Sequence, residues 1–372
     1  MRFPEFSGEW EIYPLTDFMS FKNGMNPDAK RFGRGTKFIS VMDILNNQFI
    51  CYDNIRASVE VVDGDIETYG VNYGDILFQR SSETLEDVGQ ANVYLDSKPA
   101  VFGGFVIRGK SKSNYYPMFF RYLLASPTAR KKIIVKGAGA QHFNIGQDGL
   151  SKVCLNIPSI QEQEKIAKLF ECIDTRIATQ NKIIEKLQSL IKGIAQHCIK
   201  ESTSGNTYVK LGDICQITTG KLDANAQVDN GIYPFFTCAE QPFKIDSFAF
   251  DTEALLISGN GANLGYINYY HGKFNAYQRT YVLDIFSENI QYIKWALKVL
   301  LPKRIAIEKS SSNTPYIVLS TLSDLRLPIP NKSIQCHIAK LMQSLERKLS
   351  SQIALNGSYN RLKQYLLRQM FI

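Results

Sequence analysis

A long apolar stripe runs through the middle of the chain, with spacings of four and three residues in alternation. It extends from Ile166 to Cys198, and nine of its ten positions are apolar, the exception being Gln180. A seam sustained over more than four heptads is typical of a coiled coil. The pattern therefore predicts a first long helix over residues 158–200. The positions expected to face a partner helix include Ile166, Phe170, Ile173, Ile177, Ile184 and Leu187.

The entrance of this helix occurs twice in the chain. Residues 157–170 read IPSIQEQEKIAKLF and residues 329–342 read IPNKSIQCHIAKLM, at an offset of 172. The fronts of the two copies also match, because Leu15 corresponds to Leu211 at an offset of 196. The second copy is thus 24 residues shorter. A repeat of this length indicates duplicated domains rather than a solenoid of short units.

A second long helix is predicted over residues 330–372, with a less regular seam. Gln352, Asn356 and Lys363 interrupt it. Gln352 and its counterpart Gln180 can fix the register of a seam or reach out to solvent, and both interpretations stay open. The positions that fit the seam are Ile338, Met342, Leu345 and Leu349, and the residues expected to shift the stripe sideways are Ile353, Leu355, Leu362 and Leu366; all of these helix contacts are expected to face the partner helix or a docked subunit.

The chain is therefore expected to hold two globular domains in tandem, each followed by a long helix. The predicted segments are a first domain at 1–157, a helix at 158–200, a polar linker at 201–207, a second domain at 208–329 and a helix at 330–372. Each helix exposes an apolar stripe, so the other helix is the expected partner. Antiparallel pairing would place the two domains at opposite ends and parallel pairing at the same end. The intervening second domain favours the antiparallel coiled coil without forcing it.

Both globular segments have the mixed pattern of an α/β fold, with short β-rich runs followed by a helix. The β-rich runs are residues 37–41, 75–79, 102–108, 254–258 and 280–286, and the helical stretches are residues 116–126 and 289–300.

Composition narrows the functional classes. The net charge of +8 is compatible with a polyanionic partner such as nucleic acid. The seven cysteines are scattered, without a C-x-x-C pair, so they predict reduced thiols rather than a disulfide framework or a zinc site. The sequence shows no apolar run of 18 residues and no apolar leader region. A cytoplasmic protein without metal or membrane span is expected.

Basic segments occupy matching places in the two domains and are candidates for contacts to DNA. Lysine and arginine bind phosphate, and asparagine, glutamine and arginine read base edges. A solvated helix end followed by a turn is the competing interpretation for either segment alone, and the repetition favours function. The candidates are Arg80, Lys131, Lys132, Lys136, Gln141 and Asn144 in the first domain and Arg279, Lys303, Arg304, Lys309, Ser310 and Asn313 in the second.

No catalytic motif is evident. The TTGKL segment lacks the first glycine of a P-loop, where Cys215 stands, and its Ser/Thr position holds Leu222. The glycines at 259, 261 and 265 do not match the dinucleotide-binding fingerprint. The four histidines show no metal-ligand spacing, and no methyltransferase tetrapeptide occurs. These observations predict a protein that is not an enzyme.

Over essentially its whole length the chain resembles the specificity subunit of Type I restriction–modification systems. The similarity rests on the opening RFPEFSGEWEIYPLTDFMSFKNG and on the Ile-Pro, Glu-Gln and Ile-Ala signature, which includes Glu162 and Gln163. In the second copy, Ile334 and Cys336 flank Gln335, so the Glu-Gln pair is degraded there.

The resemblance implies two target recognition domains that each read half of an interrupted, asymmetric DNA site, with the helices setting the spacing. It implies that two modification (methyltransferase) subunits dock on the helices, with Glu162 and Gln163 among the docking residues, and that restriction subunits add translocation and cleavage. S-adenosylmethionine, ATP and Mg are then expected on the partner subunits, and none in this chain. The alternative is a coiled-coil scaffold that binds protein without DNA specificity.

Overall fold

The chain forms two compact units that share its two longest helices. The computed structural model describes residues 1–139, 141–202, 207–309 and 316–371. Unit 1 combines Met1–Asn181 with Leu355–Ile372, and unit 2 is Lys182–Ala354. Both α6 (Ile160–Glu201) and α9 (Lys332–Met370) cross this boundary. Each unit therefore holds a globular domain with half of each long helix, and this division cuts across the consecutive segments predicted from the sequence.

Unit 1 is built on two small sheets. One has the order β2-β9-β5-β7 and is antiparallel throughout, and the other has the order β4-β3-β8. Their strands are β2 (Met19–Asn23), β3 (Phe32–Ile39), β4 (Ser58–Val59), β5 (Ile76–Gln79), β7 (Ala91–Val93), β8 (Val101–Phe102) and β9 (Val106–Ser111). The helices of the domain are α1 (Val41–Asn46), α2 (Asp65–Tyr69), α3 (Pro117–Ala125), α4 (Pro127–Ile134) and α5 (Gln147–Ser151).

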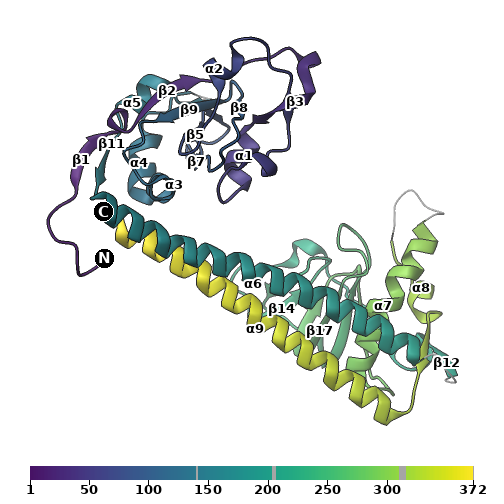
Figure 1. Ribbon diagram of the computed structural model, residues 1–372. Helices are drawn as coiled ribbons and strands as arrows, with labels where there is room; N and C mark the ends of the chain where they lie inside the picture. The colour runs from purple at the N-terminus through teal and green to yellow at the C-terminus, as the bar shows by residue number, and fades with distance from the viewer. Residues whose placement is uncertain (140, 203–206, 310–315, 372) are drawn as a thin grey trace. The chain divides into compact units, whose positions relative to one another are not determined.

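Strand β5 is buried on both faces, which explains its uninterrupted apolar run. Ile76 and Phe78 pack with α3 and the start of α6, whereas Leu77 packs into a second cluster with Phe102 and Tyr94. Successive side chains of a strand point to opposite faces, so one strand serves two cores. Figure 1 shows α3 between this sheet and α6.

Unit 2 has one six-stranded sheet, in the order β13-β18-β16-β17-β14-β15. Its strands are β13 (Gln216–Thr219), β14 (Tyr233–Phe236), β15 (Phe243–Ile245), β16 (Phe250–Ser258), β17 (Ile267–Ala276) and β18 (Thr280–Asp284). Like β5, strand β16 contributes to two cores. Leu255 and Ile257 pack with α7 (Ile290–Lys309), and Leu256 packs into a second cluster on the opposite face of the sheet. A short helix, α8 (Leu319–Ser323), follows α7.

Strand pairing aligns the two domains in detail. The trio β2-β9-β5 corresponds to β13-β18-β16, and the parallel pair β3-β8 corresponds to β14-β17. The offset between matching residues is 179 at β5 and β16, and 174 from β8 to β9. The single long strand β17 replaces both β7 and β8, so part of the shortening of the second copy lies there.

A two-stranded sheet leads into each long helix. In unit 1, β1 (Glu11–Pro14) pairs antiparallel with β11 (Cys154–Ile157), and in unit 2, β12 (Thr207–Lys210) pairs with β19 (Arg326–Ile329). A proline follows both β11 and β19, as the strand-like runs before each helix predict. Unit 1 also contains the small pair β6 (Ser81–Ser82) and β10 (Phe143–Asn144).

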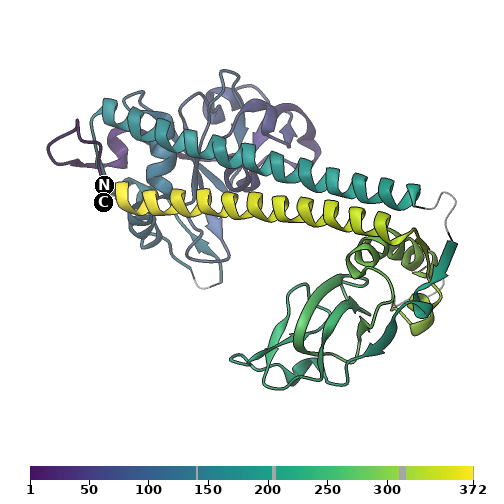
Figure 2. The same cartoon turned by 90° about the horizontal axis from the view of Figure 1, so that it is seen from below.

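The long helices pair in antiparallel fashion, and contacts inside each unit show it independently. In unit 1 the start of α6 packs against the end of α9, where Phe170 stacks on Phe371 with ring centroids 5.7 Å apart. In unit 2 the end of α6, including Ile199, packs against the start of α9, including Met342. Both views show the two helices side by side (Figures 1 and 2). The predicted fold class is therefore confirmed, and the antiparallel alternative is the correct one.

The seam of α9 does not shift sideways as expected. Gln352, Asn356, Tyr359 and Lys363 are half-buried, and the apolar neighbours that were expected to replace them stay exposed. Lys363 is accommodated because its Nζ lies 2.5 Å from Asp174 Oδ1 of α6. The exposed residues are Ile353, Leu355 and Leu362, whereas Leu366, the fourth residue expected in the shifted stripe, is buried. Among the described residues, no helix is long and apolar enough to cross a membrane.

Candidate nucleic-acid interface

Three loops meet beyond the end of β5 in unit 1. Arg80 is at their centre: its amide N–H donates to the Phe105 carbonyl at 2.9 Å, and its own carbonyl accepts from the Ile145 amide at 2.9 Å. Its guanidinium Nη1 also donates to the Gly104 carbonyl at 3.2 Å. We call this set of segments, residues 80–82, 103–106 and 141–145, the three-loop face of unit 1.

Unit 2 builds the same face from equivalent backbone groups. The Gly259 amide donates to the Arg279 carbonyl at 2.8 Å, and the Gly259 carbonyl accepts from the Ile317 amide at 2.8 Å. Gly259 therefore takes the place of Arg80, and Ile317 that of Ile145. The three-loop face of unit 2 comprises residues 259–265, 277–280 and 316–318.

The face of unit 1 brings together three of the predicted DNA-binding residues. Asn144 is exposed, and its side-chain oxygen accepts from the Ser81 hydroxyl. Gln141 is exposed on the same loop, three residues earlier. Arg80 is half-buried, and its guanidinium contact with Gly104 orders the neighbouring turn. The face thus carries amide side chains and a guanidinium on adjoining loops, and these are the groups that read base edges in DNA.

The face of unit 2 presents a different set of groups. Arg279 is exposed, and no carboxylate of the described residues lies within ion-pair distance of it. Asn260 accepts from the Cys238 thiol at 2.9 Å, and Asn263 donates to the Cys238 carbonyl at 3.0 Å. These two bonds brace the glycine-containing loop 259–265 from inside. These hydrogen bonds hold the loop as a turn, and in the part of the chain that the structure describes no nucleotide-binding βαβ unit accompanies it.

The three lysines predicted around the first basic loop do not lie on the three-loop face. Lys131 and Lys132 belong to α4, and only Lys136 follows it. Lys132 is turned toward β11, where its Nζ donates to the Cys154 carbonyl at 3.0 Å. Lys131 and Lys136 are exposed. The first basic segment is therefore a helix end followed by a turn, because Ala129 and Ile133 pack into the core and the helix continues as far as Ile134.

The second basic segment is also helical. Lys303 and Arg304 lie within α7, which continues past Pro302 to Lys309. Lys303 is exposed, while Arg304 Nε lies 2.8 Å from Glu308 Oε1 one turn later. The predicted residues Ser310 and Asn313, and the side chain of Lys309, lie outside the described part of the chain.

Glu162 is buried in unit 1, and the N-terminal segment of the same chain donates hydrogen bonds to its carboxylate. Its two carboxylate oxygens accept from Nε and Nη2 of Arg2, each at 2.7 Å, and the Trp10 indole donates to it at 3.3 Å. Glu162 is only 1% exposed. Its carboxylate therefore fastens residues 1–10 to the start of α6, and a docking subunit would meet its neighbours rather than the carboxylate itself.

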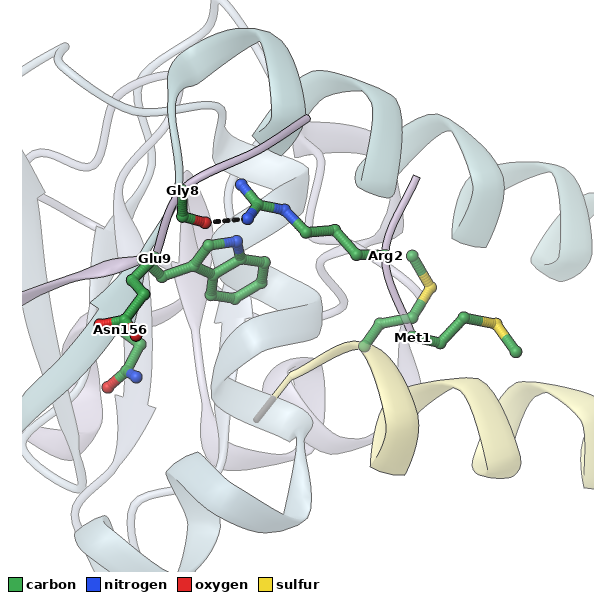
Figure 3. A pocket seen from close by; sticks show the side chains of 7 residues that line it. Met1, Arg2, Gly8, Glu9 and Asn156 are labelled. Carbon is green, nitrogen blue, oxygen red and sulfur yellow. Dashed lines mark hydrogen bonds between the residues drawn. The ribbon is translucent and has the colours of Figure 1, made fainter. Parts of the chain in front are cut away.

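A cavity of about 320 Å³ lies beside this contact (Figure 3). Met1, Trp10 and Met370 give it an apolar lining, and the Arg2 guanidinium at its edge also donates to the Gly8 carbonyl. The N-terminal ammonium is bound as well, because it donates to the Gln369 carbonyl at 2.5 Å. The Arg2 guanidinium and the N-terminal ammonium are thus both bound within the chain.

Gln163 joins the first domain to α6. Its side-chain oxygen accepts from the Tyr116 amide at 3.0 Å, and its Nε2 donates to the Pro158 carbonyl at 3.0 Å. Tyr116 is the N-cap of α3, so the bond satisfies an amide at a helix start. The sequence marked Gln163 as a docking residue, and the structure adds this internal role.

The remaining predicted helix positions belong to the seam. Ile166, Phe170 and Ile173 are buried in unit 1 with Leu366. Ile177 packs against the same cluster. In unit 2, Leu187, Ile338, Leu345 and Leu349 share one cluster. Ile184 is half-buried. Gln180 is buried, so it does not reach solvent.

Sequence reasoning missed Phe105, which stands out on the three-loop face. Its side chain is 69% exposed, beside Arg80 and the turn glycines. The signal available in the sequence was the Gly-Gly pair before an aromatic residue, within a run that otherwise reads as one strand. Strand pairing divides that run into β8, a turn and β9.

Comparison with known proteins places the chain in a family. The family described as "Type I restriction modification DNA specificity domain" matches residues 7–189 and 203–356. The specificity subunit of the Type I restriction enzyme EcoDI of Escherichia coli is 42% identical over 143 residues, which cover 38% of this chain and 32% of that subunit.

Solved structures share the fold. The S subunit of a Type I restriction–modification system from M. genitalium has a TM-score of 0.62 at 16% identity, covering 100% of this chain and 99% of the other. A chain from a study of complex assembly in the type I R-M system has a TM-score of 0.61 at 15% identity, covering 98% and 97%. The tandem domains, the two long helices and the match over both copies together show that this chain belongs to the Type I restriction modification DNA specificity domain family.

Proposed function

We propose that this chain is the DNA-reading subunit of a Type I restriction–modification complex and that it carries no catalytic centre of its own. The observation that supports this most directly is the three-loop face, which is built twice from equivalent backbone hydrogen bonds but displays different side chains. Two copies of one scaffold with different surface chemistry suit a bipartite site whose halves differ in sequence. Each domain reads one half of this asymmetric site.

The helices α6 and α9 set the spacing between the half-sites and dock two modification subunits. The seam buries one stripe of each helix, and other apolar side chains remain outside it. In unit 2 these are Ile183, Leu190, Leu341 and Ile353, and in unit 1 they are Leu355, Leu362 and Tyr365. Exposed apolar groups of this size are typical of surfaces that are covered in an assembly. S-adenosylmethionine, ATP and Mg act on the partner subunits, and restriction subunits complete the complex.

Methylation mapping of the host genome tests the proposal. Cells with and without this gene are compared, and one bipartite adenine-methylation motif disappears with the gene. If no motif depends on the chain, the DNA-reading function is wrong, and the coiled-coil scaffold without DNA specificity becomes the better explanation.

The electrostatic part of the proposal has a test of its own. Lys131 and Lys132 are adjacent on α4, but only Lys131 is free of the Cys154 carbonyl. In the assembled complex, the logarithm of the affinity for DNA falls with the logarithm of the salt concentration. Lys131→Ala makes this negative slope shallower by about one, as loss of a phosphate contact requires. Lys132→Ala is the matched control and leaves the slope unchanged. Equal slopes for wild type, Lys131→Ala, Lys136→Ala and Lys303→Ala would remove these lysines from the interface.

A further inference from the structure

One β-turn on the three-loop face is identical in backbone construction in the two domains. In unit 1 the Val106 amide donates to the Gly103 carbonyl at 2.9 Å, and in unit 2 the Thr280 amide donates to the Tyr277 carbonyl at 2.8 Å. A constant offset of 174 holds from β8 through the turn into β9. Phe105 and Arg279 therefore occupy the same position.

Each turn is anchored from both sides. Its first residue donates to the neighbouring parallel strand, from Gly103 to the Ile39 carbonyl at 3.0 Å and from Tyr277 to the Phe236 carbonyl at 2.9 Å. The central loop residue then donates to the carbonyl of Phe105 or Arg279, as described above. Hydrogen bonds on both flanks fix the backbone at the third turn residue, and with it the direction of the Cα–Cβ bond.

Close packing beneath the turns adds to this rigidity. A Cβ at Gly24 would lie 2.0 Å from the Gly103 carbonyl oxygen, and a Cβ at Gly220 would lie 1.9 Å from the Ala276 carbonyl oxygen. Gly24 and Gly220 are themselves equivalent residues at the end of the first sheet strand. The chain therefore passes directly under the same turn in both units, and only glycine permits that approach.

The side chains at this shared position differ in chemistry. Phe105 is 69% exposed, although burial of a phenyl ring away from water would be favourable. Arg279 is exposed without a carboxylate partner among the described residues. A rigid scaffold that holds an unburied ring in one copy and an unpaired guanidinium in the other presents both groups for an external contact.

We propose that this turn position determines base specificity in each half-site. Arg279 reads a guanine in the half-site of the second domain, because a guanidinium can bind its O6 and N7 together. Phe105 contacts a thymine methyl group in the half-site of the first domain, an apolar contact that distinguishes thymine from the other bases. The assignment rests on the proposed DNA-reading function and names the residues that carry it.

The test is methylation mapping in the native host with single substitutions in the full chain. Arg279→Lys keeps the charge but loses the two-pronged geometry, so one guanine of one half-site becomes degenerate, with discrimination falling about 10-fold or more. Phe105→Ala relaxes one thymine in the other half-site. Phe105→Arg gives the sharper result, because the first domain then gains a guanine preference at that position.

Matched controls separate specificity from folding. Tyr73→Ala removes another exposed aromatic residue of unit 1, and Arg326→Gln removes an exposed arginine of unit 2 on β19. Both leave the motif intact. If the wild type yields a motif and none of the three variants alters it, the inference is overturned and the proposed function is unaffected. A variant that alters both half-sites overturns it as well. If the wild type yields no motif that depends on the chain, the proposed function itself fails.

Discussion

Gln163 and Gln335, 172 residues apart, make the same pair of hydrogen bonds in the two units. Each side-chain oxygen accepts a backbone amide just before the domain helix, from Tyr116 or from Asn289, at 3.0 Å. Each Nε2 donates to the carbonyl of the proline that precedes the long helix, at 3.0 and 2.8 Å. The glutamine, and not the glutamate beside it, is thus the feature that both copies of the helix entrance retain.

Replacing either glutamine should destabilise its own unit. Gln163→Ala removes the partner of the part-buried Tyr116 amide and of the buried Pro158 carbonyl, which costs about 1–3 kcal/mol. The two tryptophans provide separate probes, because Trp10 lies in unit 1 and Trp295 in unit 2. Denaturant unfolding of a Trp295→Phe background, followed by Trp10 fluorescence, should show a lower midpoint for Gln163→Ala.

Gln335→Ala should show the corresponding effect through Trp295 in a Trp10→Phe background. Gln188→Ala, at an exposed position of α6, serves as the control and should change neither midpoint. An unchanged midpoint for Gln163→Ala would mean that the amide contributes no net stability.

The end of α9 completes the core of unit 1, and Phe371 is its central residue. The ring is 1% exposed and lies 5.6 Å from Phe119 and 6.3 Å from Trp10, measured between centroids. Phe371→Ala should destabilise unit 1 by about 3–5 kcal/mol through the cavity that it leaves. Tyr365→Ala, which is 52% exposed on the same helix, should cost far less. Hydrogen exchange in α3 measures both, and equal protection would contradict the role of Phe371.

A fragment of residues 1–207 should form a symmetric dimer. It lacks the end of α9, but its own α6 ends with the equivalent residues at an offset of 172, so that Ile199 stands for Phe371. In unit 2, Ile199 and Ala195 already pack in this way against the start of α9. The α6 of a second copy can therefore cover Phe170, and a true twofold predicts a palindromic DNA site.

The same geometry predicts how to tighten that dimer. Ile199→Phe should strengthen association by refilling the aromatic cluster of Phe119 and Phe170, whereas Ile199→Asp should abolish it. Sedimentation at several concentrations gives the dissociation constants. If the fragment stays monomeric at high micromolar concentration, the end of α6 cannot replace the end of α9 against the core of unit 1.

The spacing role of the helices predicts a change in the gap between half-sites. Because α6 and α9 pair within each unit, four residues must be added to both, after Asn181 and after Ala354, where the units divide. The insertion adds about 6 Å of rise and about 40° of rotation. One base pair supplies about 35° of twist, so the gap should lengthen by one, because rotation decides whether a domain faces the groove.

Methylation mapping reads both quantities in the insertion variant. The half-site sequences should stay as in the wild type. An unchanged gap, or altered half-sites, would show that the paired helices do not set the distance. Insertion after Asn181 in α6 alone serves as a comparison, since it displaces the seam from Ile184 onward and should reduce stability instead.

The sequence by itself determined the duplication, the two long helices and the mixed α/β domains. The helices and strands follow from local periodicity, and the duplication follows from comparing the chain with itself at an ungapped offset of 172. The prolines that close β11 and β19 are local signals as well, because proline acts on the residues next to it. The sequence did not determine how far the basic helices α4 and α7 extend. Their last turns are stabilised by apolar contacts with the rest of their domains.

Only the tertiary structure decided which distant groups meet. The direction of helix pairing follows from the contact of Phe170 with Phe371, which no local pattern encodes. The equivalence of Phe105 and Arg279 emerged from strand pairing, because the offset changes from 196 to 179 to 174 across loops of unequal length. Burial of Glu162 likewise depends on Arg2 and Trp10, more than 150 residues away. Pairing of this kind is set by packing and hydrogen bonding between segments, and so a linear pattern cannot specify it.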